Sequence, residues 1–576
     1  MAFKNRRNNY PLYETTHFAD FREMTENVAA KFPDRVAFRY KTNPKSSEVS
    51  AITFTECRDF VRALATELHT MDLAGKRVAI IGGASVDWFM SYVAIMSVGA
   101  VTVPIDKDLP AADMASIIST AGCAHAFVAQ DLGAKLAEVR ALAPTLTSIV
   151  SMCGELEGAT ALASLVESGK RRLEEGDRAY FDYEIDREGL ASIVFTSGTT
   201  GKGKGVMLSL KNICSDMEQG MYNFNITERT LFALPPHHTF GSTVNFIGHF
   251  AQGCEVYISA GIRYIMDELK TFKPTHLILV PLFVETFYKR IMAAAEKSGQ
   301  IKKLKSGIAL SNALRKIGID LRSRLFGKSV LSNFGGELQM IICGGAALNQ
   351  TVIDFFESIG VVILNGYGIT ECAPRISCNR NECRKNGSVG MPIIGGHVKI
   401  DSPNEAGEGE ICYKGPNVML GYFENEEATR AVIDSEGYFH TGDIGYVKTY
   451  GKDQWIYITG RIKNLIILSN GKNVYPEELE CDIQGVWGVN EVVVYQGESK
   501  ANPELELIVA EIYPDYDGFK AKGITDIQGY FDSAIKEINA RNVGYKFIGR
   551  VKLRTEEFPK NTSRKITRFK IDKTVE

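Results

Sequence analysis

The sequence predicts an α/β protein with two domains of unequal size. Its 576 residues exceed what one hydrophobic core normally supports. Buried strands alternate with helical segments from Arg77 onward, which favours mostly parallel sheets flanked by helices. A β-rich subdomain is expected over residues 389–458, and a small, mobile α+β domain after it. We place the boundary near Arg461, which gives domains of residues 1–461 and 462–576.

The first part of the chain carries the clearest periodic patterns. Residues 18–32 and 54–71 have the apolar spacing of amphipathic helices. The segments VAIIGG, AVTVPI and AHAFVAQ are typical of short buried strands separated by helices. The charged segment 154–178 is expected to be a surface connection.

One uncharged segment, Trp88 to Ile105, is just long enough for a membrane span. Gly99 and Pro104 interrupt it, and its second half resembles a buried strand that follows a helix. We therefore interpret it as part of a soluble core.

Composition narrows the class of protein. With 66 basic and 69 acidic residues the chain is almost neutral, which argues against a dedicated nucleic-acid binder. Eleven scattered cysteines without a C-x-x-C pair favour a reducing, cytoplasmic setting. Cys372, Cys378 and Cys383 have no common zinc spacing and are interpreted as free thiols. The N-terminus has no apolar segment of the kind found in secretory signals.

The segment from Ala191 to Leu210, ASIVFTSGTTGKGKGVMLSL, is predicted to be a strand, a flexible loop and a helix. Its glycines, hydroxyl groups and two lysines suit the binding of phosphate oxygens. Gly198, Gly203 and Lys204 match part of a Walker P-loop, but Gly205 stands where the magnesium-binding Ser or Thr belongs. The order TSGTTGKGKGV instead resembles the phosphate loop of the adenylate-forming superfamily. This superfamily includes acyl-CoA synthetases, adenylation domains and luciferases, and it usually has Pro at position 203.

Further segments resemble this superfamily in the expected order. GYGITE (366–371) resembles the segment with an aromatic ring against adenine, a Thr at the α-phosphate and a Glu for magnesium. YFHTGDIG (438–445) resembles the ribose-binding segment, and GRIKNLI that of the second ribose contact and the hinge. FPKNTSRKITRFK (558–570) resembles the terminal lysine motif, although Arg564 replaces a Gly in it.

The resemblance implies a set of site residues. Those implied in nucleotide and cofactor binding are Thr196, Ser197, Gly198, Thr199, Thr200, Gly201, Lys204, Gly344, Gly345, Ala346, Asn365, Gly366, Tyr367, Gly368, Asp443, Arg461, Lys463 and Gly471. Those implied in catalysis are His238, Thr370, Glu371 and Lys565, and magnesium is assigned to Thr196 and Glu371.

The resemblance also implies a reaction. We expect ATP- and Mg²⁺-dependent activation of a carboxylic acid, followed by transfer to coenzyme A. The segments VPLFVETFYKRI and CGGAALN resemble long-chain fatty acid ligases, and Thr239 replaces the Asp that pairs with an amino-acid substrate. Transfer to the phosphopantetheine of a carrier protein and a non-catalytic adenylate-binding protein remain alternatives.

A strongly basic stretch, residues 289–328, has eleven Lys or Arg against Glu296 and Asp320. Its apolar spacing predicts amphipathic helices. Most such stretches are solvated faces. The sharper hypothesis is a contact surface for an anionic membrane at the inner face of the cell, for an acyl-carrier protein or for coenzyme A phosphates.

Overall fold

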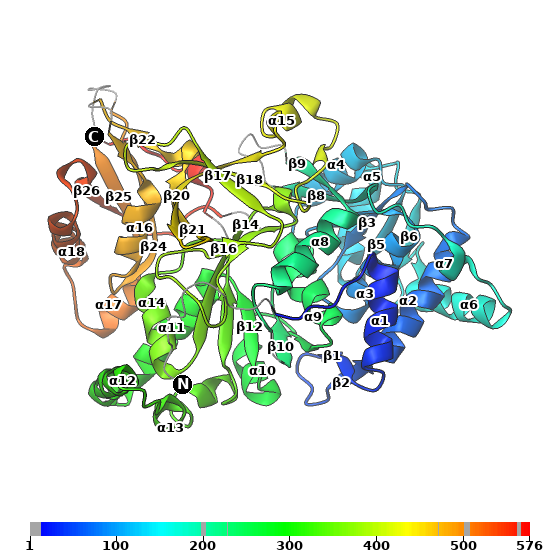
Figure 1. Ribbon diagram of the computed structural model, residues 1–576, viewed down its shortest axis with the longest axis horizontal. Helices are drawn as coiled ribbons and strands as arrows, with labels where there is room; N and C mark the ends of the chain where they lie inside the picture. The colour runs from blue at the N-terminus through cyan, green and yellow to red at the C-terminus, as the bar shows by residue number, and fades with distance from the viewer. Residues whose placement is uncertain are drawn as a thin grey trace.

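The computed structural model describes residues 13–196, 203–226, 228–469, 472–499, 507–560 and 566–575. Two large sheets stand side by side with helices between them and on their outer faces, and three smaller sheets follow in the last third of the chain (Figure 1). The fold class predicted from the sequence is confirmed.

The first large sheet has eight strands, and its central strands are parallel. In spatial order they are β19 (Gly421–Tyr422), β9 (Lys204–Ser209), β8 (Leu190–Thr196), β4 (Val101–Ile105), β3 (Arg77–Ile81), β5 (His125–Val128), β6 (Ser148–Ser151) and β7 (Thr160–Ala161). The β19–β9–β8 edge is antiparallel.

The second large sheet has nine strands and is parallel from β1 to β14. The order is β16 (Met391–Pro392), β15 (Arg375–Cys378), β14 (Val362–Gly368), β13 (Met340–Cys343), β12 (His276–Leu279), β10 (Arg229–Phe232), β11 (Glu255–Ile258), β1 (Val36–Tyr40) and β2 (Ser50–Thr53). The carboxyl ends of β13 and β14 lie next to each other, in register at Cys343 and Asn365.

The main hydrophobic core lies between the two sheets and includes Phe38, Phe89 and Phe246, whose rings contact one another. Helices that contribute to this core are α1 (Phe21–Lys31), α2 (Phe54–His69), α3 (Val86–Ser97), α6 (Leu162–Glu174), α7 (Ala179–Asp182), α8 (Leu210–Met221) and α9 (Gly248–Ala251). Successive side chains of a strand point to opposite faces of its sheet. Val78 and Ile80 of β3 therefore face this core, whereas Ala79 and Ile81 face a second core on the outer side of the sheet.

Separate cores cover the outer faces of the sheets. Over the eight-stranded sheet lie α4 (Ala111–Ala121) and α5 (Gly133–Leu142). Over the nine-stranded sheet lie α10 (Ile265–Phe272), α11 (Pro281–Lys297), α13 (Arg322–Phe326) and α14 (Gln350–Ile359), with α12 (Ile301–Lys316) partly packed beside them. The basic stretch is therefore helical, as predicted.

The last third of the chain forms the smaller sheets. The β-rich region contains β17 (His397–Asp401), β18 (Gly409–Lys414), β20 (Phe439–Tyr450) and β21 (Asp453–Arg461), with α15 (Glu426–Arg430) between β18 and β20. After Arg461 follow β22 (Ile466–Ile467), β23 (Asn473–Val474), α16 (Pro476–Gln484), β24 (Val489–Gln496), β25 (Ile508–Pro514), α17 (Tyr516–Ala521), α18 (Ile527–Arg541) and β26 (Ile548–Leu553). These last elements have their own cores, separate from that of the large sheets.

Two local predictions are corrected. The apolar segment after the phosphate loop is strand β9, paired antiparallel with β8, and the helix begins only at Leu210, after the Ser209 cap. The segment 154–178 contains helix α6, which packs closely on α2: a Cβ added to Gly169 would lie 1.8 Å from the carbonyl oxygen of Ala63. Most charged residues of α6 are exposed. Because they dominate the composition of this segment, the sequence did not reveal the contact with α2.

The uncharged segment Trp88–Ile105 forms most of helix α3 and strand β4, as predicted. Across the described parts of the chain, we find no helix with the length and apolar character needed to span a bilayer.

Candidate active site

The carboxylate of Asp443 is almost fully buried and connects the β-rich region with the nine-stranded sheet. Tyr367, on β14, donates a hydrogen bond from its hydroxyl to Oδ2 of Asp443 at 2.6 Å. Arg461 contacts the other carboxylate oxygen, with Nε 2.8 Å from Oδ1. Asp443 and Arg461 are direct cross-strand partners on β20 and β21. The Asp443 side chain is 3% exposed, so both oxygens are held in one fixed orientation.

Burial and the neighbouring carboxylate raise the pKa of Tyr367 well above its ordinary value. The phenol therefore stays protonated and remains a donor to Asp443. Tyr367 belongs to the nine-stranded sheet and Asp443 to the β-rich region. Their hydrogen bond therefore joins these two parts of the fold, across 76 positions of sequence. The ionised carboxylate of Asp443 can only accept hydrogen bonds, which suits the recognition of two neighbouring hydroxyl groups.

The predicted magnesium carboxylate, Glu371, lies in the turn after β14. Its Oε1 accepts a hydrogen bond of 2.8 Å from the hydroxyl of Tyr422. The Nζ of Lys204 lies 4.6 Å from the centre of the same Tyr422 ring. Tyr422 thus connects the strand that leaves the phosphate loop with the acidic residue. A carboxylate at this position is a hard oxygen ligand of the kind that magnesium prefers.

The two ends of the phosphate loop meet at the β8–β9 hairpin. Thr196 and Lys204 are register partners, and Oγ1 of Thr196 donates a hydrogen bond of 3.4 Å to the carbonyl oxygen of Lys204. Ser197, Gly198, Thr199, Thr200 and Gly201, predicted within the loop, lie outside the described residues, as do Gly471 and Lys565. The hairpin nevertheless fixes where the loop starts and ends.

Glycines allow three segments to meet at the ends of β13 and β14. A Cβ added to Gly344 would lie 3.4 Å from both the carbonyl oxygen of Gly366 and the ring of Phe240. Gly345 has φ +89°, and a Cβ at Gly368 would lie 2.0 Å from the carbonyl oxygen of Pro374. Any side chain at Gly368 would therefore collide with backbone. Of the other predicted residues here, Ala346 is exposed and Asn365 half-buried.

The predicted His238 is half-buried and opens the segment that carries Phe240. Its carbonyl oxygen accepts from the N–H of Gly241 at 2.8 Å, at the start of a π-helical segment over Phe240–Ile247. The neighbouring His237 ring lies 4.2 Å from the His238 ring, and burial lowers the pKa of His237. This π-helical segment thus brings His238 and the Gly344 backbone into one region.

The remaining predicted residues differ in their surroundings. The carbonyl oxygen of Thr370 accepts from the N–H of Ala373 at 3.1 Å and so belongs to the Glu371 turn. Lys463 is exposed, two residues after Arg461, at the exit from the β-rich region. Thr370 therefore lies near the Tyr367 end of the Tyr367–Asp443–Arg461 contact, and Lys463 lies near the Arg461 end.

A buried ionic network, which the sequence did not reveal, supports the Glu371 turn. Asp216 of α8 is paired with Arg375, with Nε 3.0 Å from Oδ2, and it also accepts from the Arg375 backbone N–H at 2.8 Å. Asn417 donates to the carbonyl oxygens of Cys372 and Arg375 at 2.6 and 2.7 Å. Three segments far apart in the chain thereby hold the backbone on either side of the turn.

Comparison with known proteins identifies the family of this chain. The AMP-binding enzyme family matches residues 25–423, so the chain belongs to that family. Among curated relatives, the long-chain-fatty-acid–CoA ligase FadD15 of Mycobacterium bovis is 26% identical over 91% of this chain and 90% of its own. The Arabidopsis thaliana long-chain-fatty-acid–[acyl-carrier-protein] ligase AEE15 is 27% identical over 80% of this chain and 72% of its own.

The fold also matches solved structures. The anthranilate CoA ligase AuaEII in complex with anthranoyl-AMP superimposes with a TM-score of 0.74 at 19% identity, covering 97% of each chain. This likeness shows the fold, and the family match together with the curated relatives confirms the predicted family and the ligase class.

The buried network makes a direct prediction. Replacing Arg375 by Met leaves the Asp216 carboxylate buried without its partner, which costs about 3–5 kcal/mol of unfolding free energy. The control is Arg430→Met, which breaks an exposed pair with Glu426 and costs at most about 1 kcal/mol. Chemical denaturation measures both. Equal losses in the two variants would show that the Asp216–Arg375 pair does not support the turn.

Proposed function

We propose that this enzyme uses ATP to convert a medium- or long-chain fatty acid to an acyl-adenylate and then transfers the acyl group to coenzyme A. The observation that carries the proposal is the carboxylate of Asp443, fixed by Tyr367 and Arg461 beside the Glu371 turn and the phosphate-loop hairpin. Two of the relatives described above are named as fatty acid ligases, one for coenzyme A and one for carrier protein.

Each part of the site has a role in this proposal. Asp443 and Arg461 bind the ribose hydroxyls, Tyr367 stacks on adenine, and the loop from Thr196 to Lys204 holds the phosphates. Glu371 and Thr196 would bind Mg²⁺, which supplies charge neutralisation at the phosphates. The Gly344–Ala346 segment and the segment from Asn365 to Gly368 form the walls around the adenylate, with His238 and Thr370 beside the reacting groups.

The carboxylate of the fatty acid attacks the α-phosphorus, and pyrophosphate leaves. Lys565 stabilises the negative charge that develops between the carboxylate and the α-phosphate. The coenzyme A thiol then attacks the acyl carbonyl and AMP leaves. No nucleophilic side chain takes part, because binding and electrostatics supply the catalysis.

The proposal includes a division into a domain of residues 1–461 and a C-terminal domain of residues 462–576 that turns about Lys463. Such a turn would break identifiable polar contacts between the two parts of the chain. Asn349 donates to the carbonyl oxygen of Cys481 at 2.9 Å, Lys289 donates to that of Val489 at 2.9 Å, and Lys522 pairs with Glu296 at 3.2 Å. A neutral hydrogen bond contributes about 1 kcal/mol and one with a charged group about 1.5–3 kcal/mol, which the binding of substrate would have to exceed. The turn brings the Gly471 loop to the site for the thiol step.

Lys565→Ala tests this division of roles. It should abolish adenylate formation from ATP and fatty acid but leave thioester formation from supplied acyl-adenylate within a few fold, because Lys565 acts only in the first half-reaction. Lys570→Ala, an exposed lysine five residues on, is the matched control and should change neither step. The two half-reactions are followed separately, as pyrophosphate release and as thioester formation. Equal loss of both in Lys565→Ala would refute the assignment.

Two alternatives have specific grounds. The match to an acyl-carrier-protein ligase makes phosphopantetheine a candidate acceptor, which direct competition with coenzyme A decides. Arg564, next to Lys565, is the ground for a non-catalytic adenylate-binding protein, which binds ATP without releasing pyrophosphate.

We further propose a cytoplasmic enzyme that contacts anionic membrane through α12 and α13, which lie together at one edge of the molecule (Figure 1). Large apolar side chains are exposed beside the cations, with Leu310 at 53% and Ile317 at 72% exposure. The exposed cations are Lys302, Lys303, Lys305, Lys316, Arg324 and Lys328. A cation-rimmed apolar surface suits a membrane that supplies both phosphate groups and acyl chains.

Charge reversal tests the membrane contact. Changing Lys302, Lys303 and Lys305 to Glu should weaken sedimentation with vesicles containing phosphatidylserine by about 100-fold or more, since each lysine near an anionic surface contributes about 1 kcal/mol. The control reverses three exposed lysines elsewhere, Lys45, Lys452 and Lys520. Unchanged vesicle binding in the α12 variant, or equal loss in the control, would exclude this surface.

A further inference from the structure

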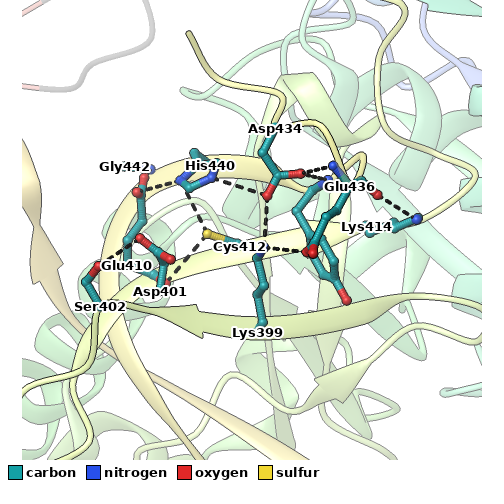
Figure 2. A network of polar contacts seen from close by, with 11 residues as sticks. Lys399, Asp401, Ser402, Glu410, Cys412, Lys414, Asp434, Glu436, His440 and Gly442 are labelled. Carbon is teal, nitrogen blue, oxygen red and sulfur yellow. Dashed lines mark hydrogen bonds and ion pairs between the residues drawn. The ribbon is translucent and has the colours of Figure 1, made fainter. Parts of the chain in front are cut away.

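Three side chains of types that bind metal ions lie together on the sheet of the β-rich region. Glu410 and Cys412 are two apart on β18, and His440 on β20 is the cross-strand partner of Cys412. One ligand atom from each residue lies within 4.8 Å of the other two. Figure 2 shows the three side chains converging from the two strands. Their positions are fixed by strand pairing, which suits a preorganised site.

The separations are close to those that a tetrahedral ion requires. The Nδ1 atom of His440 lies 2.8 Å from Oε2 of Glu410 and 3.4 Å from Sγ of Cys412. Zinc bonds of about 2.0 Å to nitrogen and oxygen and about 2.3 Å to sulfur hold N and O about 3.3 Å apart and N and S about 3.5 Å apart. The nitrogen and sulfur already have this spacing, and the separation of the nitrogen and oxygen would widen by about 0.5 Å.

Supporting contacts of the kind found around metal ligands are also present. The other ring nitrogen of His440, Nε2, lies 3.7 Å from Oδ2 of Asp434, and Lys399 holds that carboxylate oxygen at 2.8 Å. The other carboxylate oxygen of Glu410 accepts from the N–H of Gly442 at 2.8 Å. A carboxylate behind a ligating histidine and a donor behind a ligating carboxylate are what orient such ligands.

We propose that Glu410, Cys412 and His440 bind a zinc ion, with water from the solvent side as the fourth ligand. Sulfur and imidazole ligands favour zinc over magnesium or calcium. The side chains of His440 and Glu410 are 27% and 19% exposed, so an ion can enter from solvent.

Binding has a defined proton balance. A cysteine binds zinc as its thiolate, so coordination replaces the S–H bond by an S–Zn bond and releases one proton to solvent. Zinc binding should therefore weaken as the pH falls.

The experiment uses the full chain, first treated with a chelator and then titrated with Zn²⁺ against a chromophoric competitor. We expect one tight site per chain that Cys412→Ser and His440→Gln abolish. Asp434→Asn, which keeps all three ligands, should weaken it by about 10- to 100-fold. Cys153→Ser removes an exposed thiol and should leave the affinity unchanged.

A second measurement tests directly whether the sulfur of Cys412 binds the metal ion. Co²⁺ in place of Zn²⁺ should give a thiolate-to-cobalt charge-transfer band that is present in Cys153→Ser and absent in Cys412→Ser. Circular dichroism establishes that each variant is folded. Absence of stoichiometric binding in the unaltered chain, or equal affinity in Cys412→Ser, would overturn the proposal and leave a hydrogen-bonded Glu410–His440 pair.

The position of the cluster suggests what the ion does. Gly442, held by Glu410, directly precedes Asp443, so a bound ion would stiffen the segment that presents the ribose carboxylate. This consequence rests on the proposed function, whereas the zinc titration needs no nucleotide, so the two can fail separately. Removal of zinc should weaken ATP binding severalfold in the unaltered chain and have no effect in Cys412→Ser. Equal ATP affinity with and without bound zinc would refute the coupling.

Discussion

The carboxylate of Asp443 imposes the constraint on which the site depends. A carboxylate that is almost fully buried needs strong donors, and here they come from Tyr367 and Arg461. Tyr367 ends the parallel sheet, and Arg461 is the last residue of β21 before the chain enters its final elements. One buried charge therefore fixes the large sheet, the β-rich region and the start of the C-terminal segment relative to one another.

The rest of the site follows from backbone that long-range contacts hold in place. Asn417 and the Asp216–Arg375 pair secure the turn that carries Glu371, and Tyr422 connects that turn to the strand after the phosphate loop. These supports are buried or half-buried and come from separate segments of the chain. Such an arrangement keeps the side chains of the candidate site in fixed positions.

Periodicity was sufficient to predict many elements, because helices such as α2 and strands such as β3 have strongly patterned apolar residues. It failed at β9, where a short apolar segment fits a strand or a helix equally well and only pairing with β8 decides. It also failed at α6, whose contact with α2 depends on Gly169 and on a distant partner.

Local sequence patterns are also insufficient to predict the contacts of the candidate site. The motifs around Tyr367 and Asp443 are visible in the sequence, but their contact joins segments 76 residues apart and needed the fold. Tyr422, Asp216 and Cys412 carry no local signal, since a lone Tyr after Gly, a helical Asp and a strand Cys each have ordinary structural explanations. Their partners lie on other elements, and no pattern within one segment specifies such pairs.

The most direct test of the account is acid-dependent ATP–pyrophosphate exchange across fatty, aryl and amino acids. The account predicts exchange with medium- or long-chain fatty acids. It also predicts a rate lower by about 10- to 100-fold in Asp443→Asn at limiting ATP, because hydrogen bonds to a charged group contribute about 1.5–3 kcal/mol. No exchange with any acid, despite clear ATP binding, would contradict the account and identify the chain as an adenylate-binding protein without this activity.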